Sequence, residues 1–443
     1  MRAPGPKFNM AFHLAIRSPK ESLIMLQSLE QKYGDVAGFR FGPFDVTFVA
    51  NPDYIEQVLL NRETYIKINE PTGLRYLLGN GLLTNEGDFW LKQRRLIQPI
   101  FHKQRLEFFS SMIADATGEM LAEWEKKQGR TTDIFSEMNS LTLDVVNRTL
   151  FSTNIKGESE KISNAITNIL KAFRRRAQFL RVPLWLPVPN HLRIRYYRQV
   201  LYETIEKIIG SRKLLTDQPN DLLTMLMEVE DADTRERMTE QQLRDEVLTI
   251  FIAGHETTAN ALTFAIYLLS KHPEAKAKLQ QEADEVLKDG KISFEQLGKL
   301  EYTTMVAKEA MRLYPPAWIM PRQVAQEDSI GGYQVKKGDM VIVSPFVMHK
   351  SSRFWENPDT FRPERFQPEH MRGKPRYAYF PFGGGARLCV GNNFAMMELQ
   401  IILAKIYRQY DLQVPDNFTI DLFPSVTLRP DSRVPVKVIK RNL

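Results

Sequence analysis

The 443-residue sequence contains a single cysteine, Cys389. One cysteine excludes an internal disulfide, so the fold does not depend on an oxidising compartment. No uninterrupted apolar run approaches the roughly 18–20 residues that span a bilayer. The start of the chain, Met1-Arg-Ala-Pro-Gly-Pro-Lys7, lacks the basic-then-apolar pattern of a secretory signal. These absences predict a cytoplasmic protein.

The sequence also has no internal repeat, no low-complexity tract and no linker-like break. Apolar residues make up 43% and aromatic residues 10% of the chain, which is enough for a large core and excludes a disordered protein. The net charge is +7, but the basic residues are not gathered in a tail, so little supports a nucleic-acid partner. We expect one large domain over residues 1–443, in which residues 1–30 form an N-terminal lead segment.

Hydrophobic periodicity predicts a mainly α protein with small β-sheets. The clearest element is a long helix that begins near Thr239, where Thr239 and Gln242 can form a capping box, and continues to Ser270 before Pro273. At 1.5 Å per residue it is about 45–50 Å long, so it crosses the whole domain.

The remaining elements follow from strand, helix and turn signals. We expect two strands within 36–50, mostly helix from 52 to about 180, a helix over 302–314, a hairpin over 330–343 with its turn at 337–339, an irregular stretch over 345–382, and a helix from just after Cys389 to about Tyr410.

Cys389 lies at the end of a glycine-rich loop, Phe380-Pro-Phe-Gly-Gly-Gly-Ala-Arg-Leu-Cys389, where a helix is expected to begin. Three consecutive glycines let the backbone approach a bulky group closely. Free N–H groups and the helix dipole favour a thiolate at such a position. Taken alone, however, an isolated cysteine near a helix start is more often a small buried apolar residue.

The residues around Cys389 decide between these two interpretations. Six of them, Phe382, Gly383, Gly385, Arg387, Cys389 and Gly391, match the pattern F-x-x-G-x-R-x-C-x-G after its first glycine. This loop resembles the haem-binding loop of the cytochrome P450 family. Four further segments resemble motifs of the same family in the same order: Trp90-Leu-Lys-Gln-Arg94, Ala253-Gly-His-Glu-Thr-Thr258, Glu309-Ala-Met-Arg312 and Pro363-Glu-Arg-Phe366.

The resemblance implies a soluble, bacterial-type cytochrome P450 monooxygenase, with motifs similar to those of fatty-acid hydroxylases. It implies haem b between the long central helix and the Cys389 loop, with the Cys389 thiolate as the iron ligand. The implied haem-binding residues are Trp90, Arg94, Arg322, Phe382, Arg387, Ala253 and Gly254, in which the arginines pair with the propionates. Glu309, Arg312 and Arg365 are implied to form a buried charge cluster that holds the cysteine loop.

Glu256 and Thr257 are the implied catalytic pair, an acid and an alcohol that deliver protons during O₂ activation. Gly254 in a helix interior costs roughly 1 kcal/mol relative to Ala, which suggests a local distortion of the helix at that point. The alternative for Thr257 is a hydrogen bond to the carbonyl four residues back. His255 begins an H-E-x-x-H pattern, but position 259 is Ala, so a two-histidine zinc site is excluded and His255 is expected to be a packing or surface residue.

The implied substrate positions are mainly aliphatic and suggest a lipophilic substrate, a fatty acid or a terpenoid, although the same residues could simply pack the core. Ala253 stands where many animal fatty-acid hydroxylases carry a Glu, so an ester link to haem is not expected. The substrate positions are Leu74, Leu78, Ala317, Trp318, Ile319 and Val426.

Partners are the last expectation. The substrates are O₂ and the lipophilic molecule, and the protein is expected to be a monomer. No reductase segment follows the Cys389 loop, so electrons come from a separate ferredoxin or flavodoxin with its reductase, docking near Lys92, Arg94 and Arg95. The acid-free basic segment 171–198 could touch a membrane peripherally, gate a substrate channel or form a solvated helix pair.

Two alternatives to a monooxygenase remain open. One is a haem-thiolate enzyme that uses peroxide directly, as a peroxygenase or isomerase. The other is a non-enzymatic haem sensor or carrier. Neither requires the acid and alcohol pair that the sequence contains at Glu256 and Thr257.

Overall fold

The structure is a computed structural model that describes residues 1–6, 20–68, 74–126, 128–152, 161–162, 164–166, 168–169, 172, 186–231, 234–288, 290 and 292–442. Its main helices are α2 (Lys20–Tyr33), α3 (Pro52–Leu60), α4 (Leu74–Leu78), α5 (Gly87–Ile97), α6 (Lys103–Glu125), α7 (Ile134–Phe151), α9 (Pro189–Lys213), α10 (Leu222–Glu228), α11 (Glu240–Lys271), α12 (Pro273–Val286), α13 (Glu301–Leu313), α14 (Pro345–Met348), α15 (Pro368–Met371) and α16 (Asn392–Gln409).

The strands among the described residues are short and form four small sheets. They are β1 (Val36–Phe41), β2 (Phe44–Val49), β3 (Tyr65–Lys67), β4 (Thr131–Asp133), β5 (Met320–Val324), β6 (Asp328–Ile330), β7 (Tyr333–Val335), β8 (Met340–Val343), β9 (Tyr410–Gln413), β10 (Leu422–Pro424), β11 (Leu428–Pro430) and β12 (Pro435–Lys440). The sheets have the orders β1-β2-β8-β5-β3, β4-β12-β9, β6-β7 and β10-β11. The mainly α fold with small sheets that the sequence predicts is confirmed.

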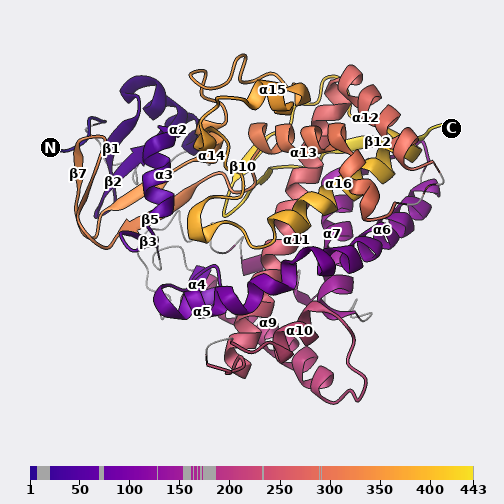
Figure 1. The fold of residues 1–443 in the computed structure, drawn as a ribbon, viewed down its shortest axis with the longest axis horizontal. Helices are drawn as coiled ribbons and strands as arrows, with labels where there is room; N and C mark the ends of the chain where they lie inside the picture. The colour runs from indigo at the N-terminus through magenta and orange to yellow at the C-terminus, as the bar shows by residue number, and fades with distance from the viewer. Residues whose placement is uncertain are drawn as a thin grey trace.

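The long helix α11 runs through the middle of the molecule, with the five-stranded sheet on one side and the α12 and α6 helices on the other (Figure 1). Thr239 caps it as predicted: the Thr239 side chain accepts from the Gln242 N–H, and the Gln242 side chain accepts from the Thr239 N–H. Its C-terminal part, from Thr258 to Leu269, is wholly buried, and the helix packs against α7, α13 and α16. Because these helices surround it, α11 is the axis on which residues from distant parts of the sequence meet.

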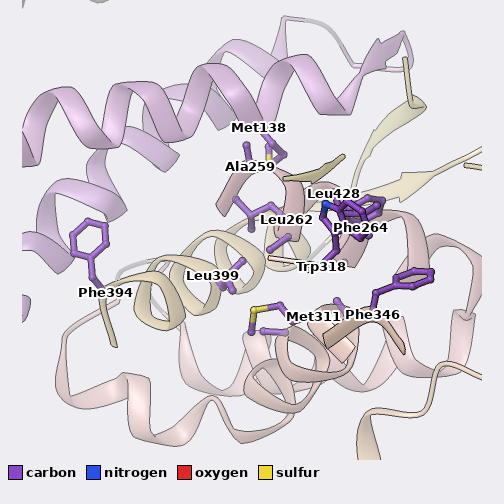
Figure 2. Close-up of a cluster of buried hydrophobic side chains, with 14 of the residues drawn as sticks. Met138, Ala259, Leu262, Phe264, Met311, Trp318, Phe346, Phe394, Leu399 and Leu428 are labelled. Carbon is purple, nitrogen blue, oxygen red and sulfur yellow. The ribbon is translucent and has the colours of Figure 1, made fainter. Parts of the chain in front are cut away.

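The apolar core is continuous from the N-terminal sheet to the C-terminal strands. Figure 2 shows part of it, where Ala259 and Leu262 lie near Met138 and Leu399. Burial of such side chains is the main favourable contribution to folding. From this continuity we infer that the chain forms one domain. Within the described residues, no helix combines the length and apolar character needed to cross a bilayer.

The predicted hairpin over 330–343 is wrong. The turn lies earlier, at Gly331 and Gly332, which both have positive φ and join β6 to β7. β8 instead pairs with β2 in parallel and with β5 in antiparallel orientation. All four residues of β8 are buried, as is expected for a strand inside a sheet rather than in a two-stranded hairpin. The glycines at 331–332 were the stronger turn signal.

A buried ion pair fixes the lower helices in Figure 1 to one another. The Arg212 guanidinium at the end of α9 donates to both Asp221 carboxylate oxygens at 2.7 Å and to the carbonyl of Phe151 at the end of α7. Asp221 in turn caps α10 by accepting from the Thr224 N–H. Three helix ends therefore share one guanidinium group.

We expect Arg212→Met to lower the melting temperature measured by circular dichroism by several degrees. The substitution leaves Asp221 buried without its cation, which costs about 3–5 kcal/mol. The matched control is Lys213→Met, because Lys213 pairs with Glu240 at the exposed surface and such pairs contribute about 1 kcal/mol or less. Equal melting temperatures for the two variants would contradict this role for Arg212.

Candidate active site

A buried cluster of one carboxylate and two guanidinium groups lies between α13 and the segment that follows β8. The Arg312 Nε and Nη2 atoms donate to the two carboxylate oxygens of Glu309 at 2.7 and 2.8 Å. The Arg365 Nε donates to Glu309 Oε1 at 3.1 Å. The structure thus brings together all three residues that sequence resemblance assigned to this cluster. The cluster contains one negative and two positive charges. The excess donors, which are the guanidinium N–H groups that do not bind Glu309, donate to other acceptors.

The excess donors bind backbone carbonyl groups of the irregular stretch 345–382. Arg312 donates to the carbonyls of His349, Pro358 and Thr360. Arg365 donates to the carbonyls of Glu356, Asn357 and Thr360. Because this stretch contains only short helical turns, few of its backbone groups are satisfied by regular secondary structure. The two arginines supply the missing donors and so hold the stretch in one conformation.

The same stretch leads into the cysteine loop, residues 380–391. The Phe380 N–H donates to His349 Nε2 at 2.9 Å, and the Tyr379 hydroxyl donates to the Lys308 carbonyl of α13 at 2.8 Å. His349 is fully buried, and desolvation together with the Arg312 charge lowers the pKa of its imidazole to about 3. The neutral ring can therefore accept the Phe380 proton at neutral pH. The charge cluster and the cysteine loop are joined through His349.

The loop itself is a compact turn. The Cys389 N–H donates to the Phe382 carbonyl at 3.0 Å, and the Gly383 N–H donates to the Phe380 carbonyl at 3.0 Å. Gly383 and Gly385 have φ values of +78° and +62°. A Cβ on Gly385 would lie 2.3 Å from the carbonyl oxygen of Leu59 at the end of α3. Gly385 is therefore required by the protein's own packing, which sequence reasoning did not foresee.

The Cys389 side chain is accessible, yet protein atoms surround it closely. Desolvation raises the pKa of its thiol, and this outweighs the Gly391 N–H hydrogen bond and the Arg94 charge, which both lower it. The helix-start effects expected from the sequence are present, but they are smaller than the desolvation. The thiol is therefore both accessible and in desolvating surroundings.

A group of cations lies close to the loop. Arg387 stacks over the Trp90 ring at 3.9 Å and pairs with Glu86. Arg322 on β5 is buried, and Lys67 is its partner on β3. Desolvation and the Arg387 charge lower the pKa of Arg322 to about 10. Desolvation and the Arg322 and Arg387 charges lower the pKa of Lys67 to about 7. Desolvation is the larger cause of both shifts, and repulsion between the neighbouring cations adds to it, partly offset by Glu86.

These cations fit a dianionic group. Within the described part of the chain, Arg322 has no ion-pair partner and donates only to the Pro321 carbonyl, while Glu86 is the carboxylate in contact with Arg387. The two propionates of a haem carry the charge that this cluster lacks. Together with the accessible Cys389 sulfur, the residues present fit a haem. Lys67 and Glu86 were missed by sequence reasoning, because only the β3–β5 register and the start of α5 bring them here.

The surface cations that were expected to receive an electron donor are already engaged. Lys92 pairs with Glu236, and Arg95 pairs with Asp231 at 3.1 Å. Arg94 points inward, and its Nη1 donates to the Leu388 carbonyl at 2.8 Å. Arg94 therefore supports the cysteine loop directly. The docking site that was expected at Lys92, Arg94 and Arg95 therefore presents less unpaired positive charge at the surface than the sequence suggests.

The middle of α11 differs from the rest of the helix because it is partly accessible. Ala253 is exposed and Thr257 half-buried, whereas Phe251 and His255 are buried. The helix is continuous through this region, so the distortion expected at Gly254 is absent. Thr257 makes the alternative bond that the sequence left open: its hydroxyl donates to the Ala253 carbonyl at 2.7 Å. A Cβ on Gly254 would lie 3.2 Å from Val146 of α7, so this glycine allows close helix packing.

The two residues that precede Thr257 in the oxygen motif, His255 and Glu256, are buried. His255 packs beside Phe251, with ring centroids 6.0 Å apart, and desolvation lowers the pKa of its imidazole to about 4. It is a packing residue, and no group of three His, Cys, Asp or Glu side chains placed to hold a metal ion occurs among the described residues. The Glu256 carboxylate accepts from the Thr427 hydroxyl at 2.8 Å. Glu256 and Thr257 therefore have separate hydrogen-bond partners.

The segments expected to face the substrate converge on α11. α4, with Leu74 and Leu78, contacts it, as does β11. The loop 316–319 is joined to the β10–β11 hairpin, since the Leu428 N–H donates to the Pro316 carbonyl and the Trp318 indole N–H donates to the Ser425 carbonyl, each at 2.9 Å. Trp318 lies in the buried cluster with Phe264 and Leu428 (Figure 2). Ala317 and Ile319 are half-buried, Leu78 is buried, and Val426 is 51% exposed.

Hydrogen bonds to its backbone anchor α4 and the loop after it. From α9, Arg198 donates to the Tyr76 carbonyl and Tyr202 donates to the Leu77 carbonyl. From α11, Asp245 accepts from the Asn80 N–H and Glu246 accepts from the Leu82 N–H, each at 2.9 Å. Of the basic segment 171–198, residues 171 and 173–185 lie outside the described residues. Arg198 is engaged with α4, and peripheral membrane contact and the monomeric state stay predictions.

A buried charge cluster joined to a cysteine loop, in a mainly α fold built around one long helix, defines the class of protein. The Cytochrome P450 family model matches residues 2–437, and the chain belongs to this family. It is an oxidoreductase of the monooxygenase type.

The chain is similar to three named relatives along most of its length. Cyclooctat-9-en-7-ol 5-monooxygenase from Streptomyces melanosporofaciens is 33% identical over 414 residues, which cover 93% of this chain and 89% of the relative. Pentalenene oxygenase from Streptomyces avermitilis is 32% identical over 391 residues, 87% of this chain and 86% of the relative. The chloroplastic carotene epsilon-monooxygenase of Arabidopsis thaliana is 29% identical over 434 residues, 93% of this chain and 80% of the relative.

The charge cluster predicts a loss of cofactor rather than a slower enzyme. We expect Arg365→Ala to yield protein with little haem, because the carbonyl groups that Arg365 binds lose their donor and the segment before the cysteine loop loosens. The ratio of Soret to 280 nm absorbance of the purified protein measures this. Arg362→Ala is the matched control, since the Arg362 side chain is 42% exposed and lies 3.7 Å from its nearest carboxylate. Full haem content in Arg365→Ala would contradict the role.

Glu246 predicts a dependence of stability on pH. It is buried, and desolvation raises the pKa of its carboxyl to about 8, although the Leu82 N–H lowers it. Between pH 4.5 and 8 the folded protein retains a proton here that the unfolded chain releases, so stability should fall as the pH rises through this window, by on the order of a few kcal/mol. Melting temperatures measured at a series of pH values should show this fall in stability in the unsubstituted protein and not in Glu246→Gln. Glu274→Gln, at an exposed position, should retain it.

Proposed function

We propose that the protein inserts one oxygen atom of O₂ into a lipophilic, terpenoid-like molecule at a haem b. Cys389 ligates the iron. Two electrons from a separate donor and two protons convert the substrate RH and O₂ to ROH and H₂O. The observation that carries the proposal is the accessible Cys389 in desolvated surroundings beside an excess of buried cations.

The proposed haem-holding residues come from the cysteine loop, β3, β5, α5 and α11. Cys389 binds the iron, and a coordinating thiol gives up its proton, which reverses the effect of its desolvation. Arg322, Lys67 and Arg387 hold the propionates, and Trp90 supports Arg387 through its ring. Phe382, Ala253 and Gly254 line the site. Bound haem supplies the oxidising chemistry, and a thiolate ligand favours O–O cleavage.

The proton-handling residues lie on α11. Thr257 holds its hydroxyl proton against the Ala253 carbonyl, next to the accessible stretch of the helix. The adjacent Glu256 is buried, and its carboxylate accepts from the Thr427 hydroxyl. General acid–base groups of this kind contribute typically 10²–10⁴-fold to a rate. For a proton to pass from Glu256 to Thr257, at least one of these two side chains must leave the hydrogen-bond partner that it has in this structure.

A terpenoid-like substrate is supported by the relatives and by the residues around α11. The three relatives are named for cyclooctat-9-en-7-ol, pentalenene and carotene. Leu74, Leu78, Ala317, Trp318, Ile319 and Val426, which we propose face or shape the substrate site, carry no charge. Ala253 has no carboxylate for an ester with the haem. Apolar pockets with few polar groups select molecules by shape and apolar area.

The donor is proposed to be a ferredoxin or flavodoxin with its reductase. An acidic partner complements the net charge of +7. Since Lys92 and Arg95 are paired with acids in this structure, docking would exchange these ion pairs for intermolecular ones.

The test uses the haem-loaded protein and a library of terpenoid hydrocarbons and alcohols. We expect the reduced, CO-treated protein to show the red-shifted Soret band of a thiolate ligand, and products to form only when NADPH, reductase and ferredoxin are all present. Products with hydrogen peroxide alone would instead support a peroxygenase. A histidine-type spectrum would exclude Cys389 as the ligand.

Thr257→Ala should retain haem but release more hydrogen peroxide per NADPH consumed, because the hydroxyl that relays protons is gone. Product and peroxide are measured together in the reconstituted system. Thr263→Ala is the matched control: Thr263 is a buried threonine of the same helix whose hydroxyl also donates to the carbonyl four residues back, at 2.7 Å. An unchanged ratio of peroxide to product in Thr257→Ala would remove Thr257 from proton delivery.

A further inference from the structure

The Glu256 side chain is held by a residue 171 positions away. The Thr427 hydroxyl, in the β10–β11 hairpin, donates to Glu256 Oε1 at 2.8 Å, and both side chains are 8% exposed. A hydroxyl has one proton to donate, so this contact uses the whole donor capacity of Thr427. In a buried setting, a hydrogen bond to a carboxylate is about twice as strong as one between neutral groups.

Asn260 completes this polar group one helical turn further along α11. Its Nδ2 lies 3.4 Å from the Thr427 oxygen and donates to it, which leaves the Thr427 proton directed at Glu256. Asn260 is fully buried, and its Oδ1 has no hydrogen-bond partner among the described residues. The three side chains therefore form a polar group, with one acceptor to spare, inside the apolar contact between α11 and the hairpin.

The hairpin is also tied to the loop that we propose faces the substrate. Trp318 donates its indole proton to the Ser425 carbonyl, and the Leu428 N–H donates to the Pro316 carbonyl. Ser425, Thr427 and Leu428 are close together on the hairpin, with the exposed Val426 among them. A displacement of this short segment by a bound molecule is therefore transmitted to Thr427, and through it to Glu256.

We infer that Thr427 is a positioning residue that sets the location of the Glu256 carboxylate, and that it links proton delivery to occupation of the substrate site. This inference rests on the proposed function, since it concerns the acid of that reaction. In the present structure Glu256 is bound to Thr427 while Thr257 is bound to Ala253, so the acid is kept away from the alcohol. Contact of a substrate with the hairpin shifts Thr427 and alters this restraint.

The experiment compares Thr427→Val with Thr427→Ser in the haem-loaded protein. Valine keeps the shape of threonine and removes the hydroxyl, whereas serine keeps the hydroxyl. We expect the ratio of hydrogen peroxide to product to change by roughly tenfold in Thr427→Val, together with a changed solvent deuterium isotope effect on NADPH consumption. Thr427→Ser should restore both. Thr263→Val, a buried substitution elsewhere on α11, is the control for loss of stability alone.

A second readout does not depend on turnover. Crystal structures of the ferric, substrate-free variants should show the Glu256 carboxylate displaced in Thr427→Val and retained in Thr427→Ser. The inference is wrong if, in Thr427→Val, Glu256 stays in place and both the ratio of hydrogen peroxide to product and the solvent deuterium isotope effect match those of the unsubstituted protein. If the unsubstituted protein forms no oxygenated product with the redox chain, the proposed function fails. The crystal structures then still decide whether Thr427 positions Glu256.

Discussion

The interaction on which the rest of the site depends is the pairing of Glu309 with Arg312 and Arg365. Its value lies less in the charges themselves than in the donors left over, which bind carbonyl groups between residues 349 and 360. A long segment with little secondary structure would otherwise have many conformations of similar free energy. Because its carbonyl groups bind two buried guanidinium groups, the segment has a single conformation. The hydrogen bond from the Phe380 N–H to His349 then connects the segment to the cysteine loop. The position of Cys389 is therefore determined from α13, through a chain of polar contacts.

The geometry around α11 gives a consistent account of how such a site can hold a cofactor and a substrate at once. The cysteine loop and the cations Lys67 of β3 and Arg322 of β5 are the groups that we propose hold the cofactor. The β10–β11 hairpin and α4 approach α11 with mainly apolar side chains. In its middle, α11 exposes Ala253 and half-exposes Thr257, whereas the residues from Thr258 to Leu269 are buried. Loops and short strands thus supply most of the candidate functional residues, and α11 carries the others.

Much of this could be predicted from the sequence because the signals were local or were carried by motifs. The capping box of Thr239 and Gln242 predicted the start of α11, and the three-residue spacing of Glu309 and Arg312 predicted that both lie on one face of α13. The pairing of β8 could not be predicted, because its buried residues read equally well as half of a hairpin. Lys67 and Glu86 were missed for a related reason: neither belongs to a motif, and only strand register and the start of α5 bring them to Arg322 and Arg387. The partner of Glu256 was likewise invisible, since a contact over 171 residues leaves no pattern in the chain.

The anchoring of α4 has a consequence for how this protein can diverge. All four hydrogen bonds described for this segment reach its backbone, at the carbonyls of Tyr76 and Leu77 and the N–H groups of Asn80 and Leu82. Backbone groups are unaffected by most substitutions, so the side chains at Leu74 and Leu78 can be exchanged while the segment keeps its place. Gly79 and Gly81 are constrained, because a Cβ at either would collide with Asp245 or Thr249. Descendants of this chain can therefore explore new substrate shapes at α4 without rebuilding the wall that carries it.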